Sequence, residues 1–105
     1  MVHAVEDKDD FDTKLSAAGD KLVVVDFHAT WCGPCKQIAP FFAGLAEEFT
    51  DVVFLKVDVD EVEDVATLYD VSSIPKFVFL KNKEKVDEML GANQDKLKAL
   101  VTQHK

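Results

Sequence analysis

The sequence predicts an α/β fold in which helices cover both faces of a central, mixed five-stranded sheet. Apolar segments of strand length alternate with stretches of helical periodicity, in the order β-α-β-α-β-α-β-β-α. Alternation over the first half implies parallel strands joined by right-handed crossovers. The last two strands flank a short polar turn, so they should run antiparallel. A chain of 105 residues without a linker is expected to form one domain, residues 1–105.

The N-terminal quarter of the chain predicts a strand, a helix and a second strand. Residues 2–5 are expected to form a short edge strand. Asp7 can cap a helix over about residues 8–18, which Gly19 would end. Residues 22–27 read Leu-Val-Val-Val-Asp-Phe, a run too short for a helix and without alternation. They therefore predict a strand that is buried on both faces.

The middle of the chain predicts a long helix, a strand and a short helix. Residues 34–49 carry a helically spaced apolar stripe, namely Ile38, Phe41, Phe42, Leu45 and Phe49. Residues 52–59 are typical of another strand. Asp60 with Glu63 three positions later predicts a capping box at the start of a helix. The apolar stripe of that helix would be Val62, Val65, Ala66 and Tyr69.

The C-terminal third predicts a β-hairpin and a final helix. Residues 77–80 and 85–90 flank the polar turn Lys81-Asn82-Lys83-Glu84. Asn93 can cap the last helix. Its inner face would consist of Leu97, Leu100, Val101 and His104.

Composition and charge exclude several classes of protein. The chain has 12 basic residues, all of them lysine, against 20 acidic ones, for a net charge of −8. Such an acidic balance argues against nucleic acid as the main partner. No apolar run approaches the roughly 20 residues that a membrane span needs. The N-terminal residues lack a basic region followed by an apolar stretch, so we expect a reducing, intracellular setting.

The only two cysteines, Cys32 and Cys35, predict redox chemistry. They are spaced i and i+3 at the expected start of a helix, within reach of each other. There the free backbone N–H groups and the helix dipole favour a thiolate, which predicts a lowered pKa for an outward-facing Cys32. Cys32 would attack a disulfide, and the less exposed Cys35 would resolve the mixed disulfide. Structural zinc is the alternative, but it needs four ligands and usually two such pairs. Two inert core cysteines are the other alternative.

The sequence around the cysteines closely resembles the active-site signature of the thioredoxins. The resemblance is carried by residues 25–36, Val-Asp-Phe-His-Ala-Thr-Trp-Cys-Gly-Pro-Cys-Lys. Further matching stretches follow in order at 57–60, 73–75, 79–82 and 91–93. The match runs from about residue 2 to the end and is most similar to the cytosolic animal type. It implies the thioredoxin fold, with a five-stranded sheet flanked by four helices.

The resemblance also implies a substrate-binding groove. Trp31 matches the tryptophan that borders the catalytic thiol, with a core tryptophan as the alternative. Pro75 matches the family's cis-proline, where an ordinary trans turn proline is the alternative. In relatives the backbone before that proline, here Ile74, pairs with an extended substrate segment. Gly91 and Ala92 match a loop that completes the groove, and their alternative is a simple turn between strand and helix.

A buried aspartate is expected to assist the reaction. Asp26 lies in an otherwise apolar strand, so burial should raise its pKa. In the family, the matching aspartate assists proton transfer that involves the resolving thiol. Lys56 matches a lysine near that aspartate, with a solvent-facing strand lysine as the alternative. An ion pair would oppose the rise, so the net shift of the Asp26 pKa stays open. Gly33 and Pro34, together with Lys56, are assigned to redox tuning.

Three residues depart from the family pattern. Lys76 follows Pro75 where threonine is usual, and its side chain could face the groove or point away from it. Lys83 stands in the hairpin turn where glycine is usual, which costs about 1 kcal/mol if its φ is positive. His28 takes a position that is often aromatic. It could be a packed histidine or a pH sensor.

The function that the resemblance implies is general protein-disulfide reduction. The expected partners are disulfide-containing proteins and a thioredoxin reductase, which supplies NADPH and FAD, while this chain needs no cofactor or metal of its own. We expect a cytoplasmic monomer that binds neither nucleic acid nor membrane. A redox-gated interaction module is the alternative. An oxidase or isomerase of secreted proteins is disfavoured, because such relatives usually have histidine where Pro34 stands.

Overall fold

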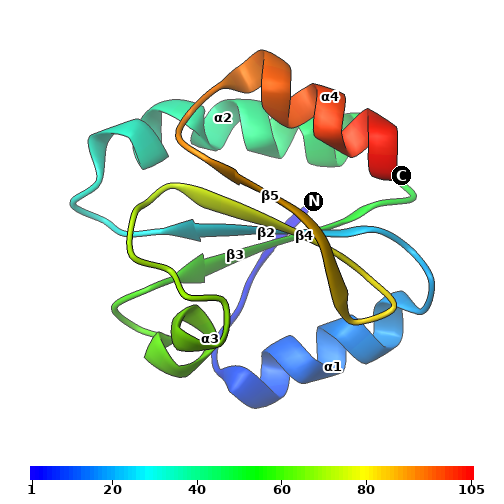
Figure 1. Ribbon diagram of the computed structural model, residues 1–105, viewed down its shortest axis with the longest axis horizontal. Helices are drawn as coiled ribbons and strands as arrows, with labels where there is room; N and C mark the ends of the chain where they lie inside the picture. The colour runs from blue at the N-terminus through cyan, green and yellow to red at the C-terminus, as the bar shows by residue number, and fades with distance from the viewer.

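A computed structural model describes the whole chain, residues 1–105, as five strands and four helices in the predicted order (Figure 1). The strands are β1 Val2–Ala4, β2 Val23–His28, β3 Val53–Asp58, β4 Lys76–Lys81 and β5 Glu84–Leu90. The helices are α1 Lys8–Ala18, α2 Gly33–Glu48, α3 Glu63–Leu68 and α4 Gln94–His104. The type of every element is confirmed, and the ends differ from prediction by a few residues at most.

The strands form one mixed sheet in the order β1-β3-β2-β4-β5. The strands β1, β3 and β2 run parallel, while β4 pairs antiparallel with both β2 and β5. The predicted parallel half and antiparallel hairpin are therefore both confirmed. Because β2 is central, its carboxyl end meets the start of β4 and the end of β5, with Phe27 opposite Lys76 and Lys76 opposite Leu90.

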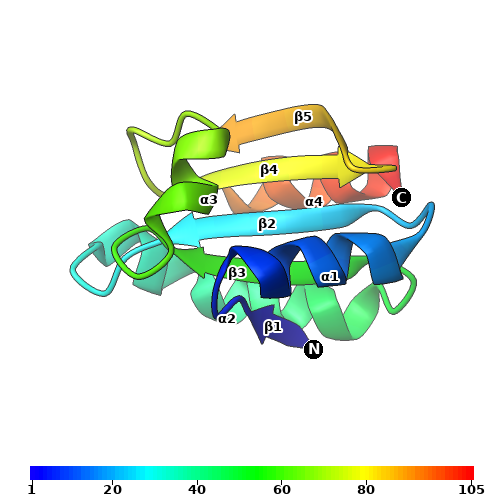
Figure 2. The same cartoon turned by 90° about the horizontal axis from the view of Figure 1, so that it is seen from below.

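Helices cover both faces of the sheet, α1 and α3 on one side and α2 and α4 on the other (Figures 1 and 2). The side chains of β2 alternate between two apolar clusters, as the pleat of a strand requires. Val25 and Phe27 join the cluster under α1 and α3, whereas Val24 joins the cluster under α2 and α4. Burial of β2 on both faces is thus confirmed. None of the helices combines the length and the apolar character needed to cross a membrane.

Two of the predicted helix caps are confirmed. The Asp7 carboxylate accepts a hydrogen bond of 2.8 Å from the backbone N–H of Asp10 at the start of α1. The Asn93 amide oxygen accepts one of 3.0 Å from Lys96 N–H at the start of α4. Each cap satisfies one of the free N–H groups of a helix end.

The predicted capping box at Asp60 and Glu63 is wrong. Val62 stands at the N-cap position of α3, and no side chain caps that helix. The Asp58 carboxylate instead accepts hydrogen bonds from the backbone N–H groups of Asp60 and Glu61, at 2.9 and 3.3 Å. The side-chain acceptor of the turn after β3 is therefore Asp58, two residues before the predicted Asp60. The Asp60 carboxylate stays free for another partner.

The hairpin between β4 and β5 turns at Asn82 and Lys83, which both adopt positive φ angles of 53° and 68°. A two-residue hairpin loop with both central residues left-handed matches the right-handed twist of the flanking strands. Asn82 tolerates that conformation well, but a lysine does not. The prediction of local strain at Lys83 depended on a positive φ, and this condition is met.

Candidate active site

The sheet register gathers the segments that the sequence singled out. The cysteine segment follows the end of β2, the Ile74–Pro75 segment precedes β4, and Gly91 follows β5. These three positions meet at one edge of the sheet because β4 is antiparallel to its neighbours. The N–H of Gly91, whose φ is +90°, donates a 2.9 Å hydrogen bond to the carbonyl oxygen of Pro75. Strand pairing thus continues past the end of the ladder and joins two of the three segments.

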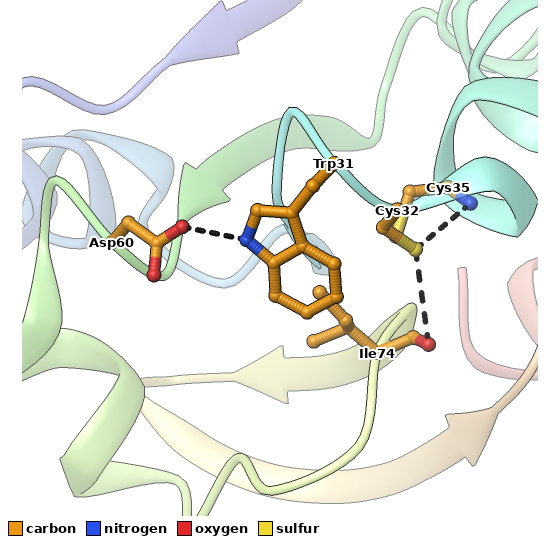
Figure 3. Close-up of a disulfide and its surroundings, with 5 residues drawn as sticks. All are labelled: Trp31, Cys32, Cys35, Asp60 and Ile74. Atoms are coloured by element: carbon orange, nitrogen blue, oxygen red, sulfur yellow. Dashed lines mark hydrogen bonds between the residues drawn. A yellow bond between two sulfur atoms is a disulfide. The ribbon is translucent and has the colours of Figure 1, made fainter.

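Cys32 and Cys35 form a disulfide at the start of α2, with a Cα–Cα distance of 5.3 Å (Figure 3). Cys32 is the N-cap residue of the helix, and Gly33 and Pro34 form its first turn. The backbone N–H of Cys35 donates to the sulfur of Cys32 at 3.2 Å. A sulfur that accepts a helix N-terminal N–H lies where a negative charge is favoured, in accordance with the prediction for Cys32.

Both cysteines are buried in this oxidised form, with exposed fractions of 5% for Cys32 and 3% for Cys35. The expectation of an outward-facing Cys32 is therefore wrong for the disulfide state. Its sulfur faces the carbonyl oxygen of Ile74 at 3.9 Å (Figure 3), and Ala29 and Ile74 pack around the pair. A disulfide sulfur carries no hydrogen, so this is a contact, which a reduced thiol could turn into a weak hydrogen bond.

Trp31 lies on the surface with an exposed fraction of 69%, which rules out the alternative of a core tryptophan. Its indole N–H donates a 2.9 Å hydrogen bond to the carboxylate of Asp60 (Figure 3). Sequence reasoning missed Asp60 as the partner that orients the indole. The signal was present, because the loops after the parallel strands β2 and β3 must emerge at the same edge of the sheet.

The peptide bond between Ile74 and Pro75 is cis, as the family resemblance implied. The backbone of Ser72, Ser73 and Ile74 forms no hydrogen bond with any other backbone group of the chain. The Ile74 side chain packs on the apolar cluster, so its main-chain groups are held at the edge of the site while their hydrogen-bonding capacity stays free. Ala92, beyond Gly91, packs against the cluster under α2 and α4.

Asp26 is buried, with an exposed fraction of 4%. Its Oδ1 has no hydrogen-bond partner in the protein. Burial raises the pKa of Asp26 to about 7, and the charge of Lys56, its neighbour across the β2–β3 ladder, opposes that rise only in part. The direction that the sequence left open is therefore upward. A carboxyl with a pKa near neutrality can accept or release a proton under ordinary conditions.

A pocket of about 310 Å³ connects this carboxyl with Cys35. It is lined by Asp26, His28, Ala29, Thr30, Cys35, Lys36, Ala39 and Lys56. Half-buried His28 therefore contributes to the site, which the sequence did not establish. Burial is the largest cause of a lowered pKa of His28, and the carboxylate of Asp58 opposes it. The imidazole is thus predominantly neutral at neutral pH, as a packed histidine would be.

Lys76 points away from the cysteines, which settles the two orientations that the sequence left open. It lies on the same side of β4 as Val78 and Leu80, which pack under α1 and α3. Its side chain is buried, and its ammonium group donates a 2.8 Å hydrogen bond to the carbonyl oxygen of Tyr69. A groove-facing charge that selects acidic substrates is therefore excluded for Lys76.

The pair of cysteines is engaged in a disulfide, and the structure gathers no group of three or more histidine, cysteine, aspartate or glutamate side chains that could hold a metal ion. The reactive groups of the site are instead the two sulfurs and a single buried carboxyl, that of Asp26. This arrangement suits thiol–disulfide exchange, which needs a thiolate, a second thiol and a proton acceptor.

Comparisons with known proteins agree with the geometry. The thioredoxin family profile matches residues 2–103. The thioredoxin of Gallus gallus is 55% identical over 101 residues, 96% of each chain, and that of Homo sapiens is 53% identical over 103 residues, 98% of each. The structure of Fasciola hepatica thioredoxin superposes with a TM-score of 0.96 at 43% identity, covering 98% of this chain and 99% of the other. With the thioredoxin fold and the disulfide at its signature position, the chain belongs to the thioredoxin family of thiol–disulfide oxidoreductases.

Proposed function

We propose that the protein is a general protein-disulfide reductase in which Cys32 is the attacking thiol. The observation that carries this proposal is the position of the Cys32 sulfur at the N-cap of α2, where it accepts the N–H of Cys35. A charge-assisted hydrogen bond from that N–H favours the thiolate over the thiol. In the reduced protein, the Cys32 thiolate attacks one sulfur of a target disulfide. A bond forms between Cys32 and that sulfur, and the second target sulfur leaves as a thiolate.

Cys35 resolves this intermediate with the help of Asp26. The Cys35 thiol gives its proton to the Asp26 carboxylate, with which it shares a pocket, and its sulfur attacks Cys32. The Cys32–Cys35 disulfide then forms, and the first target sulfur leaves as a thiolate. The target gains two electrons and, after protonation, two hydrogens, while this protein is oxidised to the state described above. A pKa of about 7 for Asp26 suits both acceptance and later release of that proton.

Protein substrates bind along the backbone at the edge of the site. The free main-chain groups of Ile74 can pair with an extended substrate segment in the manner of an added strand. Exposed Trp31 provides an apolar surface on one flank. Pro75, Gly91 and Ala92 complete the groove, and the hydrogen bond between Gly91 and Pro75 fixes their spacing.

Three further residues tune the redox pair. Gly33 and Pro34 form the short connection that keeps both sulfurs within bonding distance on one helical turn. Lys56 places a positive charge across the ladder from Asp26 and lowers the cost of ionising that buried carboxyl. We therefore expect Lys56 to influence proton transfer more than substrate binding.

The catalytic cycle closes with reduction of the disulfide by a thioredoxin reductase, whose NADPH and FAD supply the electrons. The match to animal thioredoxins over 96–98% of the chain supports a cytoplasmic, monomeric protein of one domain, without a cofactor of its own. The targets are disulfide-containing proteins rather than nucleic acids or membranes, consistent with a net charge of −8.

Reduction of insulin disulfides with dithiothreitol as the electron donor tests the proposal. The wild-type protein should turn over many times, and the Cys32→Ser variant should be inactive. The Cys35→Ser variant should accumulate mixed disulfides through Cys32 that reducing agents release. Stoichiometric reduction without turnover would refute a reductase and favour a module whose redox state only gates binding.

A further inference from the structure

The segment Asp70–Pro75, which joins α3 to β4, carries backbone that the proposed function assigns to substrate binding, yet it has few internal restraints. Within it, Ser72, Ser73 and Ile74 form no hydrogen bond with any other backbone group of the chain. Asp70 adopts a positive φ of 52°, which a non-glycine residue tolerates only when its surroundings hold it. The conformation of this segment must therefore be maintained at its ends.

One side chain connects the two ends. Lys76 directly follows Pro75, and its ammonium group donates a 2.8 Å hydrogen bond to the carbonyl oxygen of Tyr69, which directly precedes Asp70. Lys76 is only 6% exposed, so little water competes for that bond. A hydrogen bond from a charged donor is among the stronger ones in proteins. The bond thus closes the segment into a loop at its base.

Both sides of this bond are held by further contacts. The Tyr69 ring packs on Phe11 and Phe27, with ring centroids 6.0 and 5.9 Å apart. On the other side, the buried ammonium lies 3.6 Å from the carboxylate of Glu88 on β5. That ion pair compensates the buried charge, as a lysine in the interior requires. Neither contact involves the cysteines.

We propose that Lys76 is a positioning residue for protein substrates. By holding the Tyr69 carbonyl against the start of β4, it keeps the Asp70–Pro75 loop in the single arrangement that presents Ile74 to an incoming strand. The inference rests on the proposed role of Ile74 in substrate pairing. Lys76 touches neither the substrate nor the sulfurs, so it should affect binding of protein disulfides and leave the exchange chemistry unchanged.

The physical reason is the population of the binding-competent loop. If the loop adopts that arrangement for only a fraction of the time, the apparent Kd rises by the inverse of that fraction. If loss of the bond between Lys76 and Tyr69 lowers the binding-competent fraction of the loop to about one tenth, KM should rise about tenfold. A small aromatic disulfide has no backbone to pair with Ile74, and its reduction should be insensitive to the loop.

The test compares Lys76→Met with Lys85→Met. Lys76→Met keeps the apolar stem and removes the donor to Tyr69. Lys85→Met is the matched control, because Lys85 binds the same Glu88 carboxylate at 2.6 Å but is exposed and forms no hydrogen bond or ion pair with the loop. We expect Lys76→Met to raise KM for insulin about tenfold with kcat within about twofold. Lys85→Met should leave KM for insulin near the wild-type value. In Lys76→Met, the rate of reduction of a small aromatic disulfide and the alkylation rate of Cys32 should both stay near wild type.

Further measurements separate positioning from a general structural role. Hydrogen exchange at the N–H groups of Val71 and Gly91, which donate to the carbonyl oxygens of Ala66 and Pro75 at the two ends of the segment, should accelerate in Lys76→Met and not in the control, while exchange in β2 stays slow. Lys76→Arg keeps a charged donor and should recover much of the lost affinity. If Lys76→Met does not fold, Lys76→Thr replaces it under the same criteria.

Two results would overturn the inference. One is an equal loss for insulin and the small disulfide, which would indicate general disruption. The other is a folded variant with an insulin KM equal to that of the control. In either case a wild-type protein that still turns over insulin would leave the proposed reductase function intact, whereas failure of the wild type would count against that function itself.

Discussion

Replacement of Asp26 by asparagine should change the free energy of unfolding, relative to wild type, by an amount that becomes more favourable as pH rises. The carboxyl has an ordinary pKa of 3.8 and a pKa of about 7 in the folded protein, chiefly because of burial. Between these two values the unfolded chain is ionised while the folded one must stay protonated or bury a charge. A folded-state pKa above the unfolded one therefore lowers stability as pH rises through that window, and the loss is complete above about pH 7. Asparagine never ionises, so it avoids the loss.

The magnitude follows from the size of the shift. About three pKa units at about 1.4 kcal/mol each give roughly 4 kcal/mol above neutrality, falling to below about 1 kcal/mol near pH 4. Asp26 is only 4% exposed, so solvent screening reduces this figure little. The asparagine amide could leave donors unpaired in the pocket, which would subtract about 1–3 kcal/mol at every pH. The dependence on pH, rather than the absolute difference, is therefore the diagnostic quantity.

The assay is urea unfolding of the oxidised proteins, followed by circular dichroism at pH values from about 4 to about 9. The free energy of unfolding of Asp26→Asn minus that of wild type should rise by roughly 3–4 kcal/mol across that range. Asp20→Asn removes a carboxylate from an exposed position and should change stability by no more than about 0.5 kcal/mol. A difference for Asp26→Asn that is constant with pH would refute the raised pKa, and with it the proposed proton transfer.

Three further predictions concern other parts of the chain. In the reduced protein, iodoacetamide should label Cys32 faster than Cys35, because only Cys32 lies at the helix N-cap; mass mapping with equal labelling would contradict this. Lys83→Gly should raise the free energy of unfolding by about 1 kcal/mol, since glycine adopts a φ of 68° without strain; an unchanged denaturation midpoint would show that the turn is relaxed. The pKa of Asp87 is lowered, first by its hydrogen bond with His104 at 2.9 Å, so this contact stabilises the fold at neutral pH and is lost in acid; Asp87→Asn should destabilise the protein above about pH 5 and not near pH 2.

The sequence predicted most of the fold because its local signals agree with one another. Apolar runs, helical stripes and cap residues each indicate the same elements, and the caps at Asp7 and Asn93 are found as expected. The prediction of a capping box at Asp60 fails because a short motif cannot show which of several nearby carboxylates accepts the backbone hydrogen bonds of the turn. Asp58 is also close to the turn in sequence, and its carboxylate accepts the hydrogen bonds of the turn because it lies at the end of β3.

The site was predicted less completely, because several of its contacts join segments that are distant in sequence. The hydrogen bond between Trp31 and Asp60 spans two loops, and the direction of Lys76 depends on the strand register. A shift of one residue would have turned Lys76 to the other face. The pKa of Asp26 depended on whether burial or Lys56 dominates, which only the packing decides. The burial of Cys32 likewise follows from the Ile74 segment, whose approach no local pattern reveals.

The N-cap position of Cys32 makes the start of α2 influence the relative stability of the reduced and oxidised protein. The N–H of Cys35 interacts more strongly with a negatively charged thiolate than with a neutral disulfide sulfur, so the helix stabilises the reduced protein more than the oxidised one. By thermodynamic reciprocity, every increment of that preference makes the protein a weaker electron donor. The same hydrogen bond that prepares Cys32 for attack therefore limits the driving force for reducing a target. A fast nucleophile and a strong reductant are competing demands on a single backbone group.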